Sequence, residues 1–128
     1  MAEKSAVRTE RAPAPFQGAP YSQGIKVGDF VFVSGQLGLK PGDTDFSGGI
    51  AEQTEQIFAN LGAILEEAGS ALDRLVKTTV FLIDLGEFQA MNEVYARHVG
   101  DVPPARSTVE ISSLPSGARV EIDAIALL

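Results

Sequence analysis

Hydrophobic and polar residues alternate with a period of two in the last quarter of the chain. The alternation covers residues 103–111 and 119–126, and the turn-forming residues 112–117 lie between them. Period two is typical of β-strands with one buried face, and two such strands joined by a turn predict a β-hairpin. We expect one face of this hairpin to join the core and the other to carry Arg106 and Glu121.

Three earlier segments also predict strands. Residues 24–27 and 30–36 are short apolar runs separated by the turn formers Gly28 and Asp29. Residues 76–83 are β-branched and aromatic on both faces, which is typical of a strand in the interior of a sheet.

Two segments between the strands have helical periodicity instead. Apolar residues recur at three- and four-residue steps over residues 50–68, and Gly69 is placed to end that helix. Residues 84–87 resemble a capping box, with Asp in place of the usual Ser or Thr. They precede a second helix that we expect to end at Gly100, with an inward stripe of Phe88, Met91, Asn92, Tyr95 and Val99.

The order strand, strand, helix, strand, helix, strand, strand predicts an α+β domain in which two helices cover one face of a mixed β-sheet. The other face keeps large apolar side chains, namely Ile125 and Leu127 with either Phe30 and Phe32 or Val31 and Val33. A face this apolar is not stable in water. We therefore expect sheets of several subunits to pack together, with Arg106 and Glu121 near an interface between chains.

The chain of 128 residues predicts one domain. Residues from 1 to about 15 lack periodicity, so we expect a flexible N-terminal tail over residues 1–12 and the domain over residues 13–128. No charged-then-apolar leader opens the sequence, and no apolar run approaches the roughly 20 residues that span a bilayer. We expect a cytoplasmic protein.

Charge and composition narrow the choice of partner. The 17 acidic and 10 basic residues give a net charge of −7, which disfavours nucleic acid and anionic membranes as partners. There is no cysteine and only one histidine, His98, so we expect no disulfide and no metal site. These features favour a small metabolite as the ligand.

Arg106 and Glu121 are the candidates for chemistry. A guanidinium offers a planar fork of donors that matches a carboxylate, and a carboxylate can accept a proton from water. Alternative readings stay open, because an arginine on a strand commonly pairs with a surface acid and Glu121 could pair with Arg119.

Several spaced motifs resemble the RidA (YjgF-type) enamine/imine deaminases, over roughly residues 13–128. They are Tyr21-Ser22-Gln23-Gly24, Val33-Ser34-Gly35-Gln36, Val76-Lys77-Thr78-Thr79-Val80-Phe81-Leu82, Asn92-x-x-Tyr95, Pro104-Ala105-Arg106-Ser107 and Val120-Glu121-Ile122-Asp123-Ala124-Ile125-Ala126. The resemblance implies a chorismate-mutase-like fold and a homotrimer with active sites between neighbouring subunits.

The resemblance also implies an activity, 2-iminobutanoate/2-iminopropanoate deaminase. This hydrolase converts 2-aminoacrylate or 2-iminopropionate to a 2-oxo acid and ammonia without metal or organic cofactor. Arg106 would hold the substrate carboxylate and Glu121 would position or deprotonate water. The cleft residues implied are Tyr21, Ser34, Gly35 and the backbone of Thr108, where many members of the family have cysteine.

Two other functions remain open from the sequence. A non-catalytic trimer could bind 2-oxo acids as a sensor, in which case Arg106 would matter and Glu121 would not. The resemblance to some members of the superfamily also allows an RNA-acting or chaperone-like role, although the acidic excess disfavours it. At single positions, Tyr21 could simply anchor a loop, and Asn92 is best read as a hydrogen-bonding residue of the core or an interface.

Overall fold

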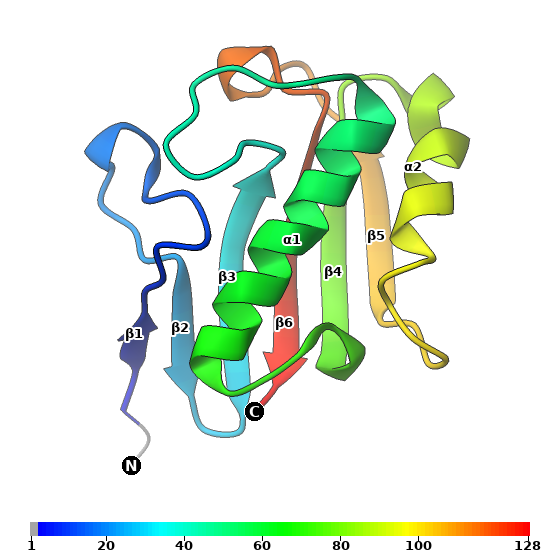
Figure 1. Cartoon of the computed structure of the whole chain (residues 1–128). Coiled ribbons are helices and arrows are strands. Elements are labelled where there is room, and N and C mark those ends of the chain that lie inside the picture. Colours follow the sequence, from blue (N-terminus) through cyan, green and yellow to red (C-terminus); the bar gives the residue numbers. More distant parts are fainter. Residues whose placement is uncertain (1–2) are drawn as a thin grey trace.

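The computed structural model describes residues 3–128 and has two layers, a six-stranded sheet and two helices (Figure 1). The strand order across the sheet is β1-β2-β3-β6-β4-β5, and only β4 and β5 run parallel. The helices are α1 (Ile50–Ala68) and α2 (Phe88–Tyr95). The strands are β1 (Ser5–Val7), β2 (Gly24–Val27), β3 (Phe30–Leu37), β4 (Leu75–Leu82), β5 (Ala105–Glu110) and β6 (Val120–Leu127).

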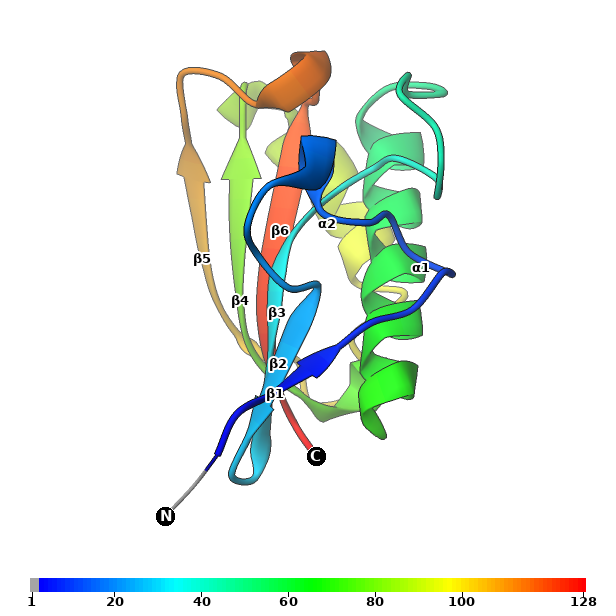
Figure 2. The ribbon, with the colours of Figure 1, turned by 90° about the vertical axis from the view of Figure 1, so that its left-hand side faces the viewer.

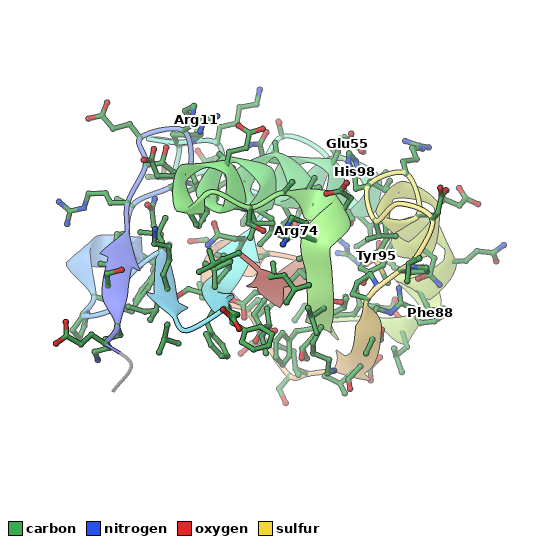
Figure 3. All side chains as sticks on the ribbon, turned by 90° about the horizontal axis from the view of Figure 1, so that it is seen from below. Arg11, Glu55, Arg74, Phe88, Tyr95 and His98 are labelled. Carbon is green, nitrogen blue, oxygen red and sulfur yellow. The ribbon has the colours of Figure 1, made fainter. Side chains whose placement is uncertain are left out.

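Both helices pack on the same face of the sheet, and the opposite face is open (Figures 2 and 3). The expected α+β architecture is therefore confirmed. The core lies between α1 and the inward side chains of the sheet. Its fully buried members include Ile57, Phe58, Leu61, Ile64 and Leu65 of α1 and Val31, Val80, Val120 and Ile122 of the strands. Each such side chain contributes about 1.5–3 kcal/mol on burial.

The ends of the predicted helices agree with the structure in one case and differ in the other. Gly69 ends α1 with a positive φ of 89°, a conformation that glycine adopts without steric cost. α2 stops at Tyr95 and not at Gly100, because the backbone changes to turns after residue 95. Asp84 accepts a hydrogen bond from the Gly86 N–H and so caps a short 3-10 turn ahead of α2.

The predicted hairpin of β5 and β6 is wrong. β4 lies between them, pairing in parallel with β5 and antiparallel with β6. This confirms the interior position expected for residues 76–83. The physical reason is that β4 is apolar on both faces and gains most from two neighbours, whereas period two identifies the faces of a strand and not its partners.

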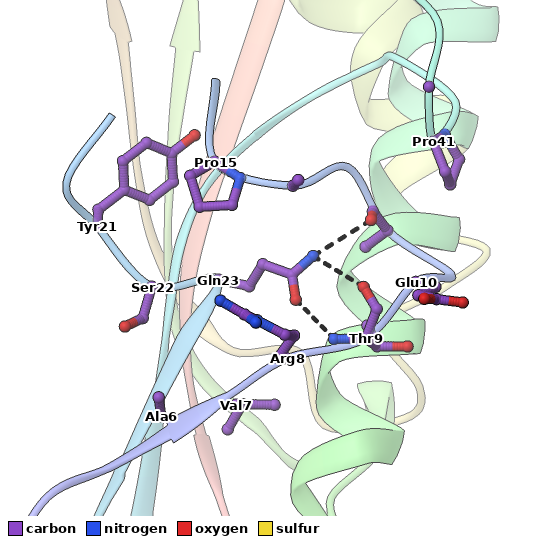
Figure 4. A pocket seen from close by; sticks show the side chains of 13 residues that line it. Ala6, Val7, Arg8, Thr9, Glu10, Pro15, Tyr21, Ser22, Gln23 and Pro41 are labelled. Atoms are coloured by element: carbon purple, nitrogen blue, oxygen red, sulfur yellow. Dashed lines mark hydrogen bonds between the residues drawn. The ribbon is translucent and has the colours of Figure 1, made fainter. Parts of the chain in front are cut away.

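The N-terminal segment also differs from the expected flexible tail. Ser5–Val7 forms the edge strand β1 on β2, and Val7 and Ala12 are buried. The Gln23 side chain accepts a hydrogen bond from Thr9 N–H and donates to the carbonyls of Thr9 and Ala12 (Figure 4). It also donates to the Pro13 carbonyl. The segment is thus packed on the domain through its pairing with β2 and the hydrogen bonds of the buried Gln23 amide. The first two residues of the predicted tail lie outside the described range.

The open face keeps the apolar side chains that the sequence placed there. Of the two pairs considered on β3, Phe30 and Phe32 are the exposed one, at 38% and 43%, and Val31 and Val33 are buried. Leu127 on the same face is 40% exposed. Within residues 3–128, no helix has the length and apolarity to cross a bilayer.

Candidate active site

Glu121 lies on the open face of the sheet, beside a bulge in β3. The pairing of β3 with β6 shifts by one residue between Val33 and Gln36, so the bulge contains Ser34 and Gly35. Bulges re-aim side chains and leave backbone unpaired. Here the bulge brings the backbone of Gly35 so close that a Cβ on this residue would lie 2.7 Å from Cδ of Glu121.

Four predicted site residues line one hollow of about 400 Å³: Tyr21, Ser34, Gly35 and Glu121. Its other walls come from Phe16, Ala19, Leu37 and Pro115. We call this the Glu121 hollow. The structure therefore brings together residues up to 100 positions apart in the sequence, from the loop before β2, from β3 and from β6.

Hydrogen bonds fix the loop that forms one wall of the Glu121 hollow. The Tyr21 hydroxyl accepts a hydrogen bond from the Phe16 N–H at 2.6 Å. The Ser34 hydroxyl donates to the Ser22 carbonyl, also at 2.6 Å. Tyr21 therefore anchors the loop, as one reading of the sequence allowed, and its ring lines the hollow as well.

The environment of Glu121 favours a proton acceptor. Burial, and secondarily the negative charge of Asp123 two residues along the same face, raise the pKa of the Glu121 carboxyl. The alternative ion pair with Arg119 is not formed, because Arg119 binds Glu87 at 2.6 Å. Among residues 3–128, no side chain or N–H group hydrogen-bonds the Glu121 carboxylate, which leaves it available to a ligand or water.

Arg106 is held against α2 by three side chains, which we call the Arg106 cluster. Its Nη1 donates to Asn92 Oδ1 at 2.7 Å. The guanidinium carbon lies 4.7 Å from the ring centroid of Tyr95 and 5.4 Å from that of Phe88, both distances typical of cation–π contacts. The alternative interpretation, in which Arg106 only pairs with an acidic residue at the surface, is therefore wrong.

Arg106 and Glu121 lie on opposite faces of the sheet, so the predicted shared face is wrong. Arg106 pairs in register with the buried Thr78 and points toward α2, whereas Glu121 pairs with Phe81 on the open face. The error follows from the wrong hairpin prediction. The shared face of Arg106 and Glu121 was inferred from a pairing of β5 with β6, and these strands do not pair. Within one chain, Arg106 and Glu121 therefore cannot contact the same small ligand.

Thr108 lies on the same side of β5 as Arg106, two residues along. Its side-chain oxygen is buried and, among the described residues, has no hydrogen-bond partner. No group of three or more His, Asp or Glu side chains within residues 3–128 is arranged to hold a metal ion.

Comparison with known proteins gives the family. The family model described as Endoribonuclease L-PSP, the YjgF/RidA family, matches residues 9–128. The chain belongs to this family. Among relatives of this L-PSP/RidA chain, a RutC family protein of Pyrococcus abyssi is 48% identical, covering 96% of each chain. Reactive Intermediate Deaminase A, chloroplastic, of Arabidopsis thaliana is 45% identical, covering 98% of this chain and 67% of the plant protein.

Solved structures of L-PSP/RidA proteins have the same fold. RidA from the Antarctic bacterium Psychrobacter sp. PAMC 21119 is 40% identical with a TM-score of 0.92, covering 97% of this chain and 99% of the other. E. coli TdcF with bound serine is 34% identical with a TM-score of 0.90, covering 97% and 98%.

The sequence reading missed the roles of Phe88 and Tyr95 beside Arg106, because it assigned both to the core stripe of a helix. The signal was present in their spacing. Phe88, Asn92 and Tyr95 stand at positions i, i+4 and i+7, which share one helical face. A polar Asn between two aromatic residues on an inward face indicates that this face has a polar or charged partner.

Proposed function

We propose that this protein hydrolyses reactive 2-imino and 2-enamine carboxylates, such as 2-iminobutanoate, 2-iminopropionate and 2-aminoacrylate, to 2-oxo acids and ammonia. We propose further that it does so as a cytoplasmic homotrimer with active sites between subunits. One observation carries the proposal. The Glu121 carboxylate and the Arg106 guanidinium, which belongs to the edge strand β5, lie on opposite faces of the same sheet. Two copies of the chain can bring these two groups together.

The composite site agrees with the surface of the molecule. Arg106 is on β5, which is an edge strand of the sheet, and the Glu121 hollow opens on the apolar face. Covering that face with neighbouring copies would bury Phe30, Phe32 and Leu127. A cyclic arrangement of identical chains would join the Arg106 cluster of one copy to the Glu121 hollow of the next.

In the proposed reaction, two or more of the N–H groups of Arg106 bind the substrate carboxylate. Glu121 takes a proton from a water molecule as the water oxygen bonds to the C=N carbon, and then gives this proton to the imine nitrogen. The resulting carbinolamine then loses ammonia as its hydroxyl becomes the carbonyl of the 2-oxo acid. Orientation of water against a bound imine is the main requirement, so the chemistry needs neither a side-chain nucleophile nor a cofactor.

The names of relatives support a small amino- or imino-acid ligand. One relative is named as a reactive intermediate deaminase, and the TdcF structure contains serine, which has the carboxylate and nitrogen that the proposed substrate has. Tyr21, Ser34 and Gly35 would line the site, together with the backbone of Thr108.

A complementation assay tests the composite site. A dehydratase generates 2-aminoacrylate from serine, semicarbazide traps residual imine, and the rate of imine loss is measured. We expect Arg106→Ala and Glu121→Ala each to be inactive alone. When the two variants are unfolded, mixed in equal amounts and refolded together, about one quarter of the sites should regain both wild-type residues, with activity to match. No regain of activity would exclude a site shared between chains.

The same variants separate the alternative functions. A non-catalytic carboxylate sensor would bind 2-oxobutanoate equally well with Glu121→Ala and would not accelerate imine loss. An RNA-acting role is suggested by the description of the family model, but the net charge of −7 opposes RNA binding. We expect RNA incubated with the protein to remain intact.

A further inference from the structure

Tyr95 contacts the guanidinium of Arg106 with its ring and Thr78 with its hydroxyl. The two hydroxyl oxygens, Tyr95 Oη and Thr78 Oγ1, are 2.6 Å apart in the core. Tyr95 is 5% exposed and Thr78 is fully buried. A buried hydrogen bond between two hydroxyls is costly to break, so it fixes where the end of the Tyr95 side chain lies.

The register of the sheet places this hydrogen bond next to Arg106. Thr78 on β4 is the register partner of Arg106 on β5. Tyr95 therefore reaches from α2 to the residue beside Arg106 while its ring lies under the guanidinium of Arg106 itself. The ring is further held edge-on by Phe58 of α1, with centroids 5.3 Å apart and planes at 84°.

The guanidinium needs this support because it has only one hydrogen-bonding anchor. Asn92 Oδ1 accepts a hydrogen bond from one N–H of Nη1. The other four N–H donors have no partner among residues 3–128, so they are free for a ligand. A single hydrogen bond allows the planar group to rotate about it, and a fixed aromatic face beneath the cation removes that rotation.

The geometry points to Tyr95 and Thr78 as positioning residues for Arg106: the hydroxyl pair holds the tyrosine ring, and the ring holds the guanidinium in the plane required for a two-point contact with the substrate carboxylate. This inference rests on the proposed function, in which Arg106 binds that carboxylate. Neither residue touches the substrate.

A purely structural role would also explain the hydroxyl pair, since each group satisfies the other in the core. Removing both separates the two roles. Tyr95→Phe alone or Thr78→Val alone leaves one buried hydroxyl unpaired and destabilises the protein. The double variant leaves none, so its stability should return close to that of wild type. The ring would still be untethered.

The experiment measures KM and kcat for imine hydrolysis, the affinity for 2-oxobutanoate by calorimetry, and the melting temperature. We expect KM and the calorimetric dissociation constant to rise about three- to ten-fold in both single variants and in the double variant, the range expected for one lost hydrogen bond. kcat should change by less than about two-fold, because the carboxylate is bound equally in the ground and transition states.

Two controls give the result its meaning. Thr54→Val removes another fully buried threonine hydroxyl, one that donates to the Ile50 carbonyl within α1, and should leave KM unchanged. Arg106→Ala should abolish carboxylate binding. If it does not, the proposed function fails. If it does, and the double variant binds like wild type, the positioning role alone is overturned.

Discussion

Replacing Gly35 with alanine should displace the carboxylate of Glu121 without unfolding the protein. The new methyl carbon would lie 2.7 Å from both Cδ and Oε2 of Glu121 and 3.1 Å from Cγ. Ordinary van der Waals contact begins at 3.4 Å, so the carboxyl carbon must move by about 0.7 Å. Gly35 does not have a positive φ, and its backbone therefore accommodates alanine.

The expected consequence is a loss of turnover. Misplacing a catalytic group by about 1 Å can cost roughly 100-fold in rate, so we expect kcat of Gly35→Ala to fall by about 10- to 100-fold. The affinity for 2-oxobutanoate should fall much less, because the carboxylate is held by Arg106. The semicarbazide assay gives kcat, calorimetry gives the affinity, and circular dichroism checks the fold.

Gly62→Ala is the matched control. Its Cβ would meet Leu72 Cδ1 at 3.6 Å, an ordinary contact on the outside of α1. It should leave kcat unchanged and raise the free energy of unfolding by about 0.5–1 kcal/mol, since alanine is the better helix former. A folded Gly35→Ala protein with wild-type kcat would refute the reasoning, because the position of the Glu121 carboxylate would then not matter to the reaction.

Four further predictions concern the side chains of Asp123, Glu121, Thr108 and Gln23. Because burial and Asp123 raise the pKa of Glu121, Asp123→Asn should lower that pKa and move the acidic limb of the kcat/KM profile to lower pH; an unmoved limb would contradict the base assignment. The raised pKa also means that the stability contributed by Glu121 is full below the ordinary glutamate pKa and is lost as the pH rises through the raised value, so Glu121→Gln should remove that fall in urea titrations. Thr108→Val deletes a buried, unpartnered hydroxyl and should raise the free energy of unfolding by about 1 kcal/mol with KM unchanged; an increased KM would indicate that the side chain contacts substrate. Gln23→Leu leaves the Thr9 N–H without its buried partner and should lower the free energy of unfolding by about 2–4 kcal/mol in thermal denaturation, with a wild-type melting temperature counting against a structural role for this amide.

Periodicity predicted the long and strongly patterned elements well. The helix expected over residues 50–68 is observed as α1, with Gly69 as its cap. The interior position of β4 followed from its two apolar faces. These elements are predictable because a 3.6- or 2-residue period over many positions can bury only one stripe or one face.

Short elements and pairings were predicted poorly. β1 has three residues, too few for a period, and its place depends on Gln23, which lies 14 residues from Thr9 in the sequence. The partners of β5 and β6 depend on which strand of the whole sheet most needs two neighbours. Neither the position of β1 nor the partners of β5 and β6 can be predicted from the local sequence.

Some features of the candidate site could likewise be predicted from the sequence, and others could not. The residue types by themselves determined that Arg106 can bind a carboxylate and that Glu121 can accept a proton, since these are properties of the side chains. The motifs also named Tyr21, Ser34, Gly35 and Glu121 as site residues, and the structure places these four around one hollow.

Only the tertiary structure decided that Arg106 and Glu121 face away from each other. Strand alternation fixes which residues of one strand share a face, but the direction of that face depends on the sheet order and on the helices that cover it. α2 offers Arg106 an amide and two aromatic rings, which compensate a cation turned inward, while the β3 bulge admits the Glu121 carboxylate on the opposite side.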